Sequence, residues 1–156
     1  MKKKVMFISS TGGHLDELLQ LKPIYNNYDY CIITEKTKTN IKLKDKFSKV
    51  SFLVYGTKDH LFSYVFKLIY NCFKSIFFFF KYRPDYIITT GTHTAVPMCY
   101  IGKLFRKKVV FIETFANRNT KTLAGRLVYP IADKFVVQWE EMLKLYPKAE
   151  YWGGIY

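Results

Sequence analysis

Short, continuously apolar runs that alternate with helix-like stretches constrain the fold of this chain more than any other feature. Strand-like runs lie at 4–9, 30–34, 50–54, 85–90, 108–113 and 134–138. They are apolar throughout rather than alternating, which is typical of parallel strands covered on both faces. Helix-like stretches lie between them, at 14–22, 61–80, 95–105, 121–130 and 139–145. This order predicts right-handed β-α-β crossovers and an α/β fold, a Rossmann-like doubly wound parallel sheet.

Length and composition indicate one domain over residues 1–156, because 49% of the residues are apolar and can fill a core of that size. The chain contains no internal repeat and no linker-like segment. The Lys-rich region 35–49 predicts a flexible loop or a short exposed helix.

The formal net charge of +13 predicts an anionic partner, which is a nucleic acid, an acidic membrane surface or a phosphorylated ligand. Cys31, Cys72 and Cys99 are widely spaced, which favours buried thiols in a reducing compartment. The apolar run after the N-terminal lysines is about five residues long, too short for a signal peptide. We therefore expect a protein on the cytoplasmic side of the membrane.

Polar turns follow three of the expected strands: STGGH at 10–14, GTHTAVP at 91–97 and ETFAN at 113–117. Ligands of doubly wound sheets bind beyond the carboxyl ends of the strands. The three turns therefore predict one shared site at that edge.

The first turn combines two glycines with a histidine at the start of a helix. Glycines let the backbone approach a ligand closely, and a helix N-terminus attracts phosphate, so Thr11, Gly12 and Gly13 are candidate diphosphate-binding residues. The dinucleotide and Walker patterns are both missing, which disfavours NAD and nucleotide-triphosphate binding. His14 is a candidate general base. The alternative is a tight turn with His14 capping the helix.

The other two turns offer similar chemistry. Gly91, Thr92, His93 and Thr94 can hydrogen-bond a diphosphate or a sugar, or they form only a turn and a helix cap. Glu113 ends an apolar strand, where a carboxylate is costly unless it is paired or faces a crevice, so it is a candidate base. His14, His60 and His93 do not match a metal-binding pattern, and we expect no bound metal and no cofactor.

The segment 61–83 is unusually aromatic. Twelve strongly apolar residues in 61–80 favour membrane insertion by about 6 kcal/mol, but Lys67 and Lys74 oppose it by about 6 kcal/mol, so a transmembrane span is not expected. The segment packs on the sheet as a core helix, or it docks on an anionic bilayer. The residues expected to dock are Lys67, Lys74, Phe77, Phe78, Phe79, Phe80 and Lys81. The four phenylalanines cannot all point into one core.

Four C-terminal motifs resemble the asparagine-linked glycosylation protein 14 family and its bacterial capsule and exopolysaccharide relatives. They are Glu113–Asn117 (ETFAN), Thr122–Pro130 (TLAGRLVYP), Asp133–Trp139 (DKFVVQW) and Tyr151–Gly153 (YWG). The GGH turn and the segment Arg83–Gly91 match as well, so the resemblance covers essentially the whole chain. Asn117 stands where the family usually has arginine, and 35–49 lacks the expected arginine–serine pattern.

The resemblance implies the N-terminal half of a GT-B glycosyltransferase. Such a half binds a polyprenyl-diphosphate-linked acceptor at the cytoplasmic face of the membrane and recruits a separate chain that holds the UDP-sugar. It implies that His14 or Glu113 is the base, with the diphosphate held by the glycine turns. Eukaryotic members carry an N-terminal anchor, so attachment here is expected through 61–83. The expected partner contacts are Trp152, Gly153, Gly154, Ile155 and Tyr156.

Two other functions remain open at this stage. The chain is a non-catalytic enhancer that only stabilises its partner, or a nucleic-acid-binding protein supported by charge alone. Against the second, the lysines lie in a loop and on an aromatic helix, not in a basic–aromatic RNA motif.

Overall fold

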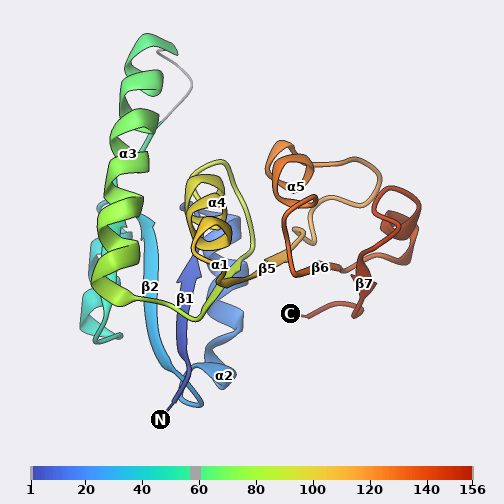
Figure 1. Cartoon of the computed structure of the whole chain (residues 1–156), viewed down its shortest axis with the longest axis horizontal. Helices are drawn as coiled ribbons and strands as arrows, with labels where there is room; N and C mark the ends of the chain where they lie inside the picture. The colour runs from blue at the N-terminus through green and yellow to red at the C-terminus, as the bar shows by residue number, and fades with distance from the viewer. Residues whose placement is uncertain (1, 57–60, 156) are drawn as a thin grey trace.

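The computed structural model describes residues 2–56 and 61–155, with the side chains of all of these except 61–64. Within these residues, seven strands form one parallel sheet in the order β3-β2-β1-β4-β5-β6-β7 (Figure 1). The strands are β1 (Lys4–Ile8), β2 (Asp29–Glu35), β3 (Val50–Leu53), β4 (Tyr86–Thr89), β5 (Lys108–Ile112), β6 (Lys134–Val137) and β7 (Glu150–Tyr151). The predicted parallel, Rossmann-like sheet is confirmed.

The six expected strands lie within one or two residues of their predicted bounds. β7 was not predicted, because a two-residue edge strand with exposed side chains has no apolar run to reveal it. It pairs in parallel with β6, through Val136 to Glu150 and Val137 to Tyr151.

The helices are α1 (Gly13–Gln20), α2 (Lys22–Tyr25), α3 (Leu61–Tyr82), α4 (Val96–Leu104) and α5 (Leu123–Val128). Two segments, η1 (Asn40–Asp45) and η2 (Glu140–Lys144), are 3₁₀ helices. The expected helix 14–22 is divided in two: α1 ends at Gln20, and Pro23 lies in the first turn of α2, where its missing N–H costs nothing. The expected helix 139–145 is 3₁₀ rather than α.

Helices cover both faces of the sheet and enclose two cores. Met6 and Ile8 of β1 belong to the core beneath α3, α4 and α5. Val5 and Phe7 of the same strand belong to the opposite core, with residues of α1, α2 and η1. Successive side chains of a strand point to opposite faces, so a strand buried on both sides is apolar throughout.

The region 35–49 is more buried than the sequence suggested. Asn40, Leu43 and Phe47 are buried, and Asn40 Nδ2 donates to the Glu35 carbonyl at 2.9 Å. Of the two predicted alternatives, a flexible loop or a short exposed helix, the structure shows a short helix, η1, but Asn40 and Leu43 on it are buried rather than exposed. Leu43 and Phe47 belong to the core that also contains Tyr25 of α2. The lysines around them, at 42, 44 and 46, obscure this apolar pair in the sequence.

The expectation that all three thiols are buried holds for two of them. Cys31 and Cys99 are buried, and burial raises the pKa of each to about 12. Cys72 on α3 is only half-buried, which corrects that position.

Three polar residues of helix α3, Asn71, Lys74 and Ser75, face the protein. The Asn71 side chain exchanges hydrogen bonds with the backbone N–H and carbonyl of Val54, both at 2.8 Å. Lys74 Nζ donates to the Phe52 carbonyl at 2.6 Å, and Ser75 is fully buried. Lys74 is thus directed at the β3 edge, and burial lowers its pKa, whereas its predicted contact with a membrane stays a prediction.

The outward face of α3 is apolar. Five side chains spaced three or four residues apart, with exposed fractions between 49% and 66%, form what we term the aromatic stripe: Phe66, Ile69, Phe73, Phe77 and Phe80. Phe78 and Phe79 are only 6% and 4% exposed and pack in the core, so their predicted docking role is wrong. Among the described residues, no helix has the length and hydropathy to cross a bilayer.

Gly102 of α4 is needed for the close contact between this helix and β4. A Cβ at position 102 would lie 2.2 Å from Cδ1 of Ile87, which is fully buried. We expect Gly102→Ala to lower the free energy of unfolding by about 1–3 kcal/mol through overpacking. Urea denaturation followed by circular dichroism measures this.

The matched control is the double variant Gly102→Ala/Ile87→Val. Valine lacks the Cδ1 methyl, so the pair should recover part of the lost stability. Equal stability of Gly102→Ala and the unmodified chain would show that the helix simply shifts.

Candidate functional site

The candidate site lies where the strand order changes direction. β1 is hydrogen-bonded to β2 on one side and to β4 on the other, so consecutive segments leave it toward opposite edges. Beyond the carboxyl ends of the strands is a cavity of about 360 Å³. Its walls are His14, Gly91, Thr92 and His93 on one side and Glu113, Thr122, Leu123 and Ala124 on the other. The structure thus brings together residues from all three predicted turns.

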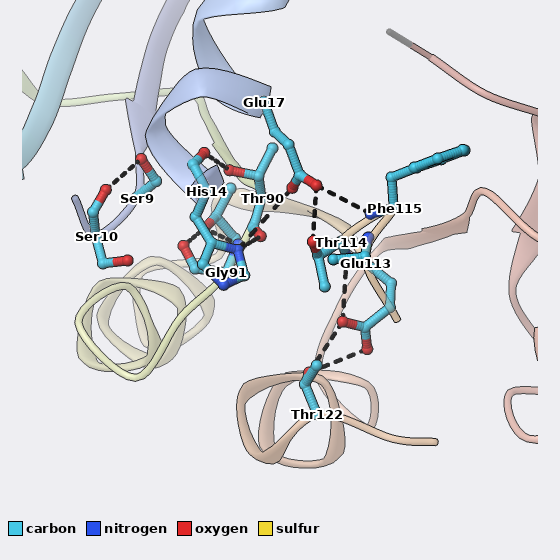
Figure 2. A network of polar contacts seen from close by, with 12 residues as sticks. Ser9, Ser10, His14, Glu17, Thr90, Gly91, Glu113, Thr114, Phe115 and Thr122 are labelled. Carbon is cyan, nitrogen blue, oxygen red and sulfur yellow. Dashed lines mark hydrogen bonds and ion pairs between the residues drawn. The ribbon is translucent and has the colours of Figure 1, made fainter. Parts of the chain in front are cut away.

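His14 is fixed by a reciprocal pair of hydrogen bonds to Thr90. Its Nδ1 lies 2.8 Å from the Thr90 carbonyl, and the Thr90 hydroxyl donates to the His14 carbonyl at 2.6 Å (Figure 2). A carbonyl only accepts, so this contact requires the proton on Nδ1. The neutral ring therefore keeps a free lone pair on Nε2, as a general base needs.

Gly91 makes this close packing possible. Its φ of 101° lies in the region that favours glycine, and a Cβ there would stand 3.3 Å from His14 Nδ1. A larger residue at position 91 would displace the imidazole.

Gly12 and Gly13 lie beside the cavity rather than in its lining. Gly12, with φ 76°, precedes α1, and the helix has no side-chain cap. Both glycines are exposed, and a Cβ at either would meet nothing within 4 Å. The start of α1 is thus open to an anion.

The second turn divides into two parts. Thr92 and His93 line the cavity, and the Thr92 hydroxyl is buried with no hydrogen-bond partner among the described residues. Thr94 instead is buried and donates to Glu35 Oε1 at 2.7 Å. Its predicted role in binding a ligand is therefore wrong: it helps to hold the turn.

Glu35 is a residue that the sequence analysis missed. Its other oxygen accepts from the Thr11 N–H at 3.2 Å, so one buried carboxylate joins the first and second turns. The Thr11 N–H is accordingly directed at Glu35 rather than at a ligand. The sequence did contain a signal for Glu35, because this glutamate follows an apolar run at the end of a strand, as Glu113 does.

Glu113 is 2% exposed and already has several hydrogen-bond donors. Its carboxylate accepts from Thr122 Oγ1 at 3.0 and 3.1 Å, from Tyr146 Oη at 3.0 Å and from the Thr114 N–H at 3.2 Å. Burial raises its pKa, and the hydrogen bonds partly oppose that rise. Glu113 therefore fixes the start of α5, where Thr122 caps the helix by accepting from the Gly125 N–H.

Residues of the Q-W motif hold the chain end near the same loop. Gln138 donates to the Glu113 carbonyl and accepts from the Ile155 N–H, each at 3.0 Å. Trp139 Nε1 donates to the Phe115 carbonyl at 2.8 Å. Trp152 is half exposed, and Tyr156, the last of the expected partner contacts, lies outside the described residues.

The described residues contain no group of three His, Cys, Asp or Glu side chains arranged to hold a metal ion. His60, which the sequence analysis weighed as a ligand, lies outside them.

Comparison with protein families gives one match that spans nearly the whole chain. The model described as "Oligosaccharide biosynthesis protein Alg14 like" matches residues 5–155. The subunit named UDP-N-acetylglucosamine transferase subunit ALG14 is 37% identical in Candida albicans over 91 residues, 54% of this chain and 42% of the relative. The Kluyveromyces lactis protein of that name is 27% identical over 190 residues, 98% of this chain and 79% of the relative.

Solved structures show the same fold in longer chains. Acinetobacter baumannii MurG superposes with a TM-score of 0.71 at 17% identity, over 89% of this chain and 42% of MurG. UDP-N-acetylglucosamine 2-epimerase from Rickettsia bellii superposes with a TM-score of 0.75 at 11% identity, over 99% of this chain and 46% of the epimerase. The chain thus spans less than half the length of these structures.

The raised pKa of Glu113 predicts a pH-dependent stability. A carboxyl group with a higher pKa in the folded chain binds its proton more tightly there, so stability falls as pH rises from the ordinary value of 4.5 through the raised one. We expect the unfolding free energy of the unmodified chain to fall relative to that of Glu113→Gln over this range. Urea denaturation between pH 4 and 8 measures it.

As a control, Glu140→Gln changes an exposed glutamate. If the unfolding free energies of Glu113→Gln and the unmodified chain change in parallel across this pH range, the raised pKa of Glu113 is contradicted.

Proposed function

The chain belongs to the Alg14-like family of oligosaccharide biosynthesis proteins, and on that basis we propose that it is the acceptor-binding subunit of a two-chain inverting glycosyltransferase. The substrate would be a polyprenyl-diphosphate-linked sugar, and a separate donor-binding chain would hold the UDP-sugar. The name of the relatives, UDP-N-acetylglucosamine transferase subunit ALG14, supports this division, because a subunit acts together with a partner chain. The product would be a lipid-linked oligosaccharide or a capsular or exopolysaccharide precursor.

One observation carries the proposal: His14 lines the cavity with its proton held on Nδ1 by the Thr90 carbonyl. The same cavity contains the unpartnered Thr92 hydroxyl, a donor for a sugar or diphosphate oxygen. The open N-terminus of α1 at Gly12 and Gly13 suits the diphosphate. These groups lie together at the change of strand order, where such folds bind ligands.

In the proposed reaction, His14 Nε2 takes the proton of an acceptor hydroxyl. The hydroxyl oxygen forms a bond to C1 of the donor sugar, and the bond from C1 to the phosphate oxygen breaks. UDP leaves with that electron pair, and the configuration at C1 inverts. Of the two bases considered, the geometry favours His14, because the Glu113 oxygens already accept from Thr122, Tyr146 and Thr114.

The aromatic stripe is the proposed membrane contact. Contiguous exposed apolar surface marks a contact site. The stripe extends to the end of α4, because the ring centroid of Phe80 lies 5.2 Å from that of Phe105, the residue after this helix. Lys81 is exposed and Lys67 half-buried on the same helix, which suits acidic headgroups. The chain would then act at the cytoplasmic face as a peripheral protein.

The donor-binding partner is proposed to contact the C-terminal segment. Trp152 is half exposed, and a Cβ at Gly154 would lie 3.7 Å from the Phe115 ring, so the segment borders the loop after β5. A partner bound there would face the cavity wall formed by Glu113.

Substitution of His14 tests the catalytic role. On vesicles with the co-purified donor-binding chain, a polyprenyl-diphosphate-linked N-acetylglucosamine acceptor and UDP-N-acetylglucosamine, we expect His14→Ala to lower kcat by about 10²–10⁴-fold, the usual contribution of a general base. A panel of other UDP-sugars tests the donor.

The matched variant is His93→Ala, which removes the second histidine of the cavity and should raise KM more than it lowers kcat. Full activity of His14→Ala would make this protein a non-catalytic enhancer of its partner.

The membrane contact is tested by Phe77→Ser/Phe80→Ser. Each ring buried in lipid is worth about 1–2 kcal/mol, so the double variant should bind vesicles rich in phosphatidylglycerol about 30–1,000-fold more weakly. Co-sedimentation with the vesicles measures this.

Ile24→Ser, on α2 across the sheet, is the matched control and should bind like the unmodified chain. Equal binding by the phenylalanine double variant would exclude the stripe as the membrane contact.

A further inference from the structure

We infer that Glu17 is a positioning residue for His14: one carboxylate oxygen holds the loop after β5, and the other faces the imidazole. The inference rests on the proposed function of His14. Glu17 lies three residues after His14 on α1, so both side chains project from the same face of the helix. Glu17 Oε2 lies 4.0 Å from His14 Nδ1.

The two oxygens of Glu17 have different surroundings. Oε1 accepts from the Thr114 hydroxyl at 2.7 Å and from the Phe115 N–H at 3.0 Å, which ties α1 to the loop after β5 (Figure 2). Oε2 is buried and has no hydrogen-bond partner among the described residues. A desolvated carboxylate oxygen without a donor is unfavourable, and a nearby positive charge relieves the cost.

In the proposed reaction, catalysis would create a positive charge on His14, and this charge would satisfy Glu17 Oε2. When Nε2 takes the acceptor proton, the ring becomes an imidazolium whose Nδ1–H lies between the Thr90 carbonyl and Glu17 Oε2. In the neutral ring, the same carboxylate favours the proton on Nδ1 over Nε2. Glu17 thus supports both the starting tautomer and the charged state of His14.

Other ionisable groups near His14 are less suited to this role. Glu113, directly after β5, interacts electrostatically with His14, but its oxygens are engaged by Thr122, Tyr146 and Thr114. His93 shares the cavity wall and offers no negative charge. Asp16 of α1 is exposed to solvent, where water screens its charge.

The test is Glu17→Gln, which keeps an oxygen for Thr114 and Phe115 but removes the negative charge beside Nδ1. In the isolated chain, ¹⁵N spectra of the neutral His14 ring should show a larger fraction with the proton on Nε2 than in the unmodified chain. In the reconstituted enzyme, kcat should fall about 10–100-fold with KM within about twofold. Backbone amide spectra verify that the variant is folded.

Two matched variants separate charge from loop anchoring. Asp16→Asn removes a carboxylate from the same turn of α1 and should change neither the tautomer nor kcat. Thr114→Val removes the hydroxyl that binds Oε1 and should leave the tautomer as it is.

Unchanged ring spectra in Glu17→Gln overturn the inference, whether or not activity falls. If the tautomer changes in Glu17→Gln but activity stays full, the inferred interaction between Glu17 and His14 holds. The proposed role of His14 as the base would then be wrong. Failure of the inference and failure of the proposed function are thus distinguished by different measurements.

Discussion

The reciprocal hydrogen bonds between His14 and Thr90 are the contact on which the candidate site depends. His14 begins the segment that leaves β1, and Thr90 ends the segment that returns through β4. The bonds therefore join the two strands at which the sheet changes its direction of growth. They fix the tautomer of the imidazole, and Gly91 leaves just enough room for the ring. A change in the spacing of these strands would separate the base from the rest of the cavity.

Three carboxylates lie around a site that is proposed to bind an anion. Their negative charges do not prevent anion binding, because each carboxylate accepts hydrogen bonds from the protein. Glu35 joins the first two turns, Glu113 anchors the start of α5, and Glu17 ties α1 to the loop after β5. Each carboxylate is directed at donors of the protein itself. The Thr92 hydroxyl and the exposed start of α1 are donors that stay open to a ligand.

Helix α3 has the opposite arrangement from an ordinary surface helix. Its polar residues Asn71, Lys74 and Ser75 face the protein, because the edge of β3 offers carbonyl and N–H groups that need partners. Its aromatic stripe faces outward, where exposure of apolar side chains is unfavourable in water. The helix is thus anchored by polar contacts to the sheet, with its apolar face left for the proposed bilayer.

The sequence alone determined the parallel sheet, the near-correct strand bounds and the convergence of the three turns, because continuous apolar runs and turn residues are local signals. It also determined that Phe77–Phe80 could not share one core. Only the tertiary structure decided which of them are buried, since that depends on how α3 packs on the sheet and on α4. The roles of Glu17, Glu35 and Thr94 likewise depend on partners that are distant in the sequence. Glu17 bonds residues 97 and 98 positions away, and Glu35 bonds Thr94 at 59 positions and the Thr11 N–H at 24. Hydrogen bonds over such separations leave no periodic pattern in the chain, so sequence reasoning could name the turns but not the contacts that hold them.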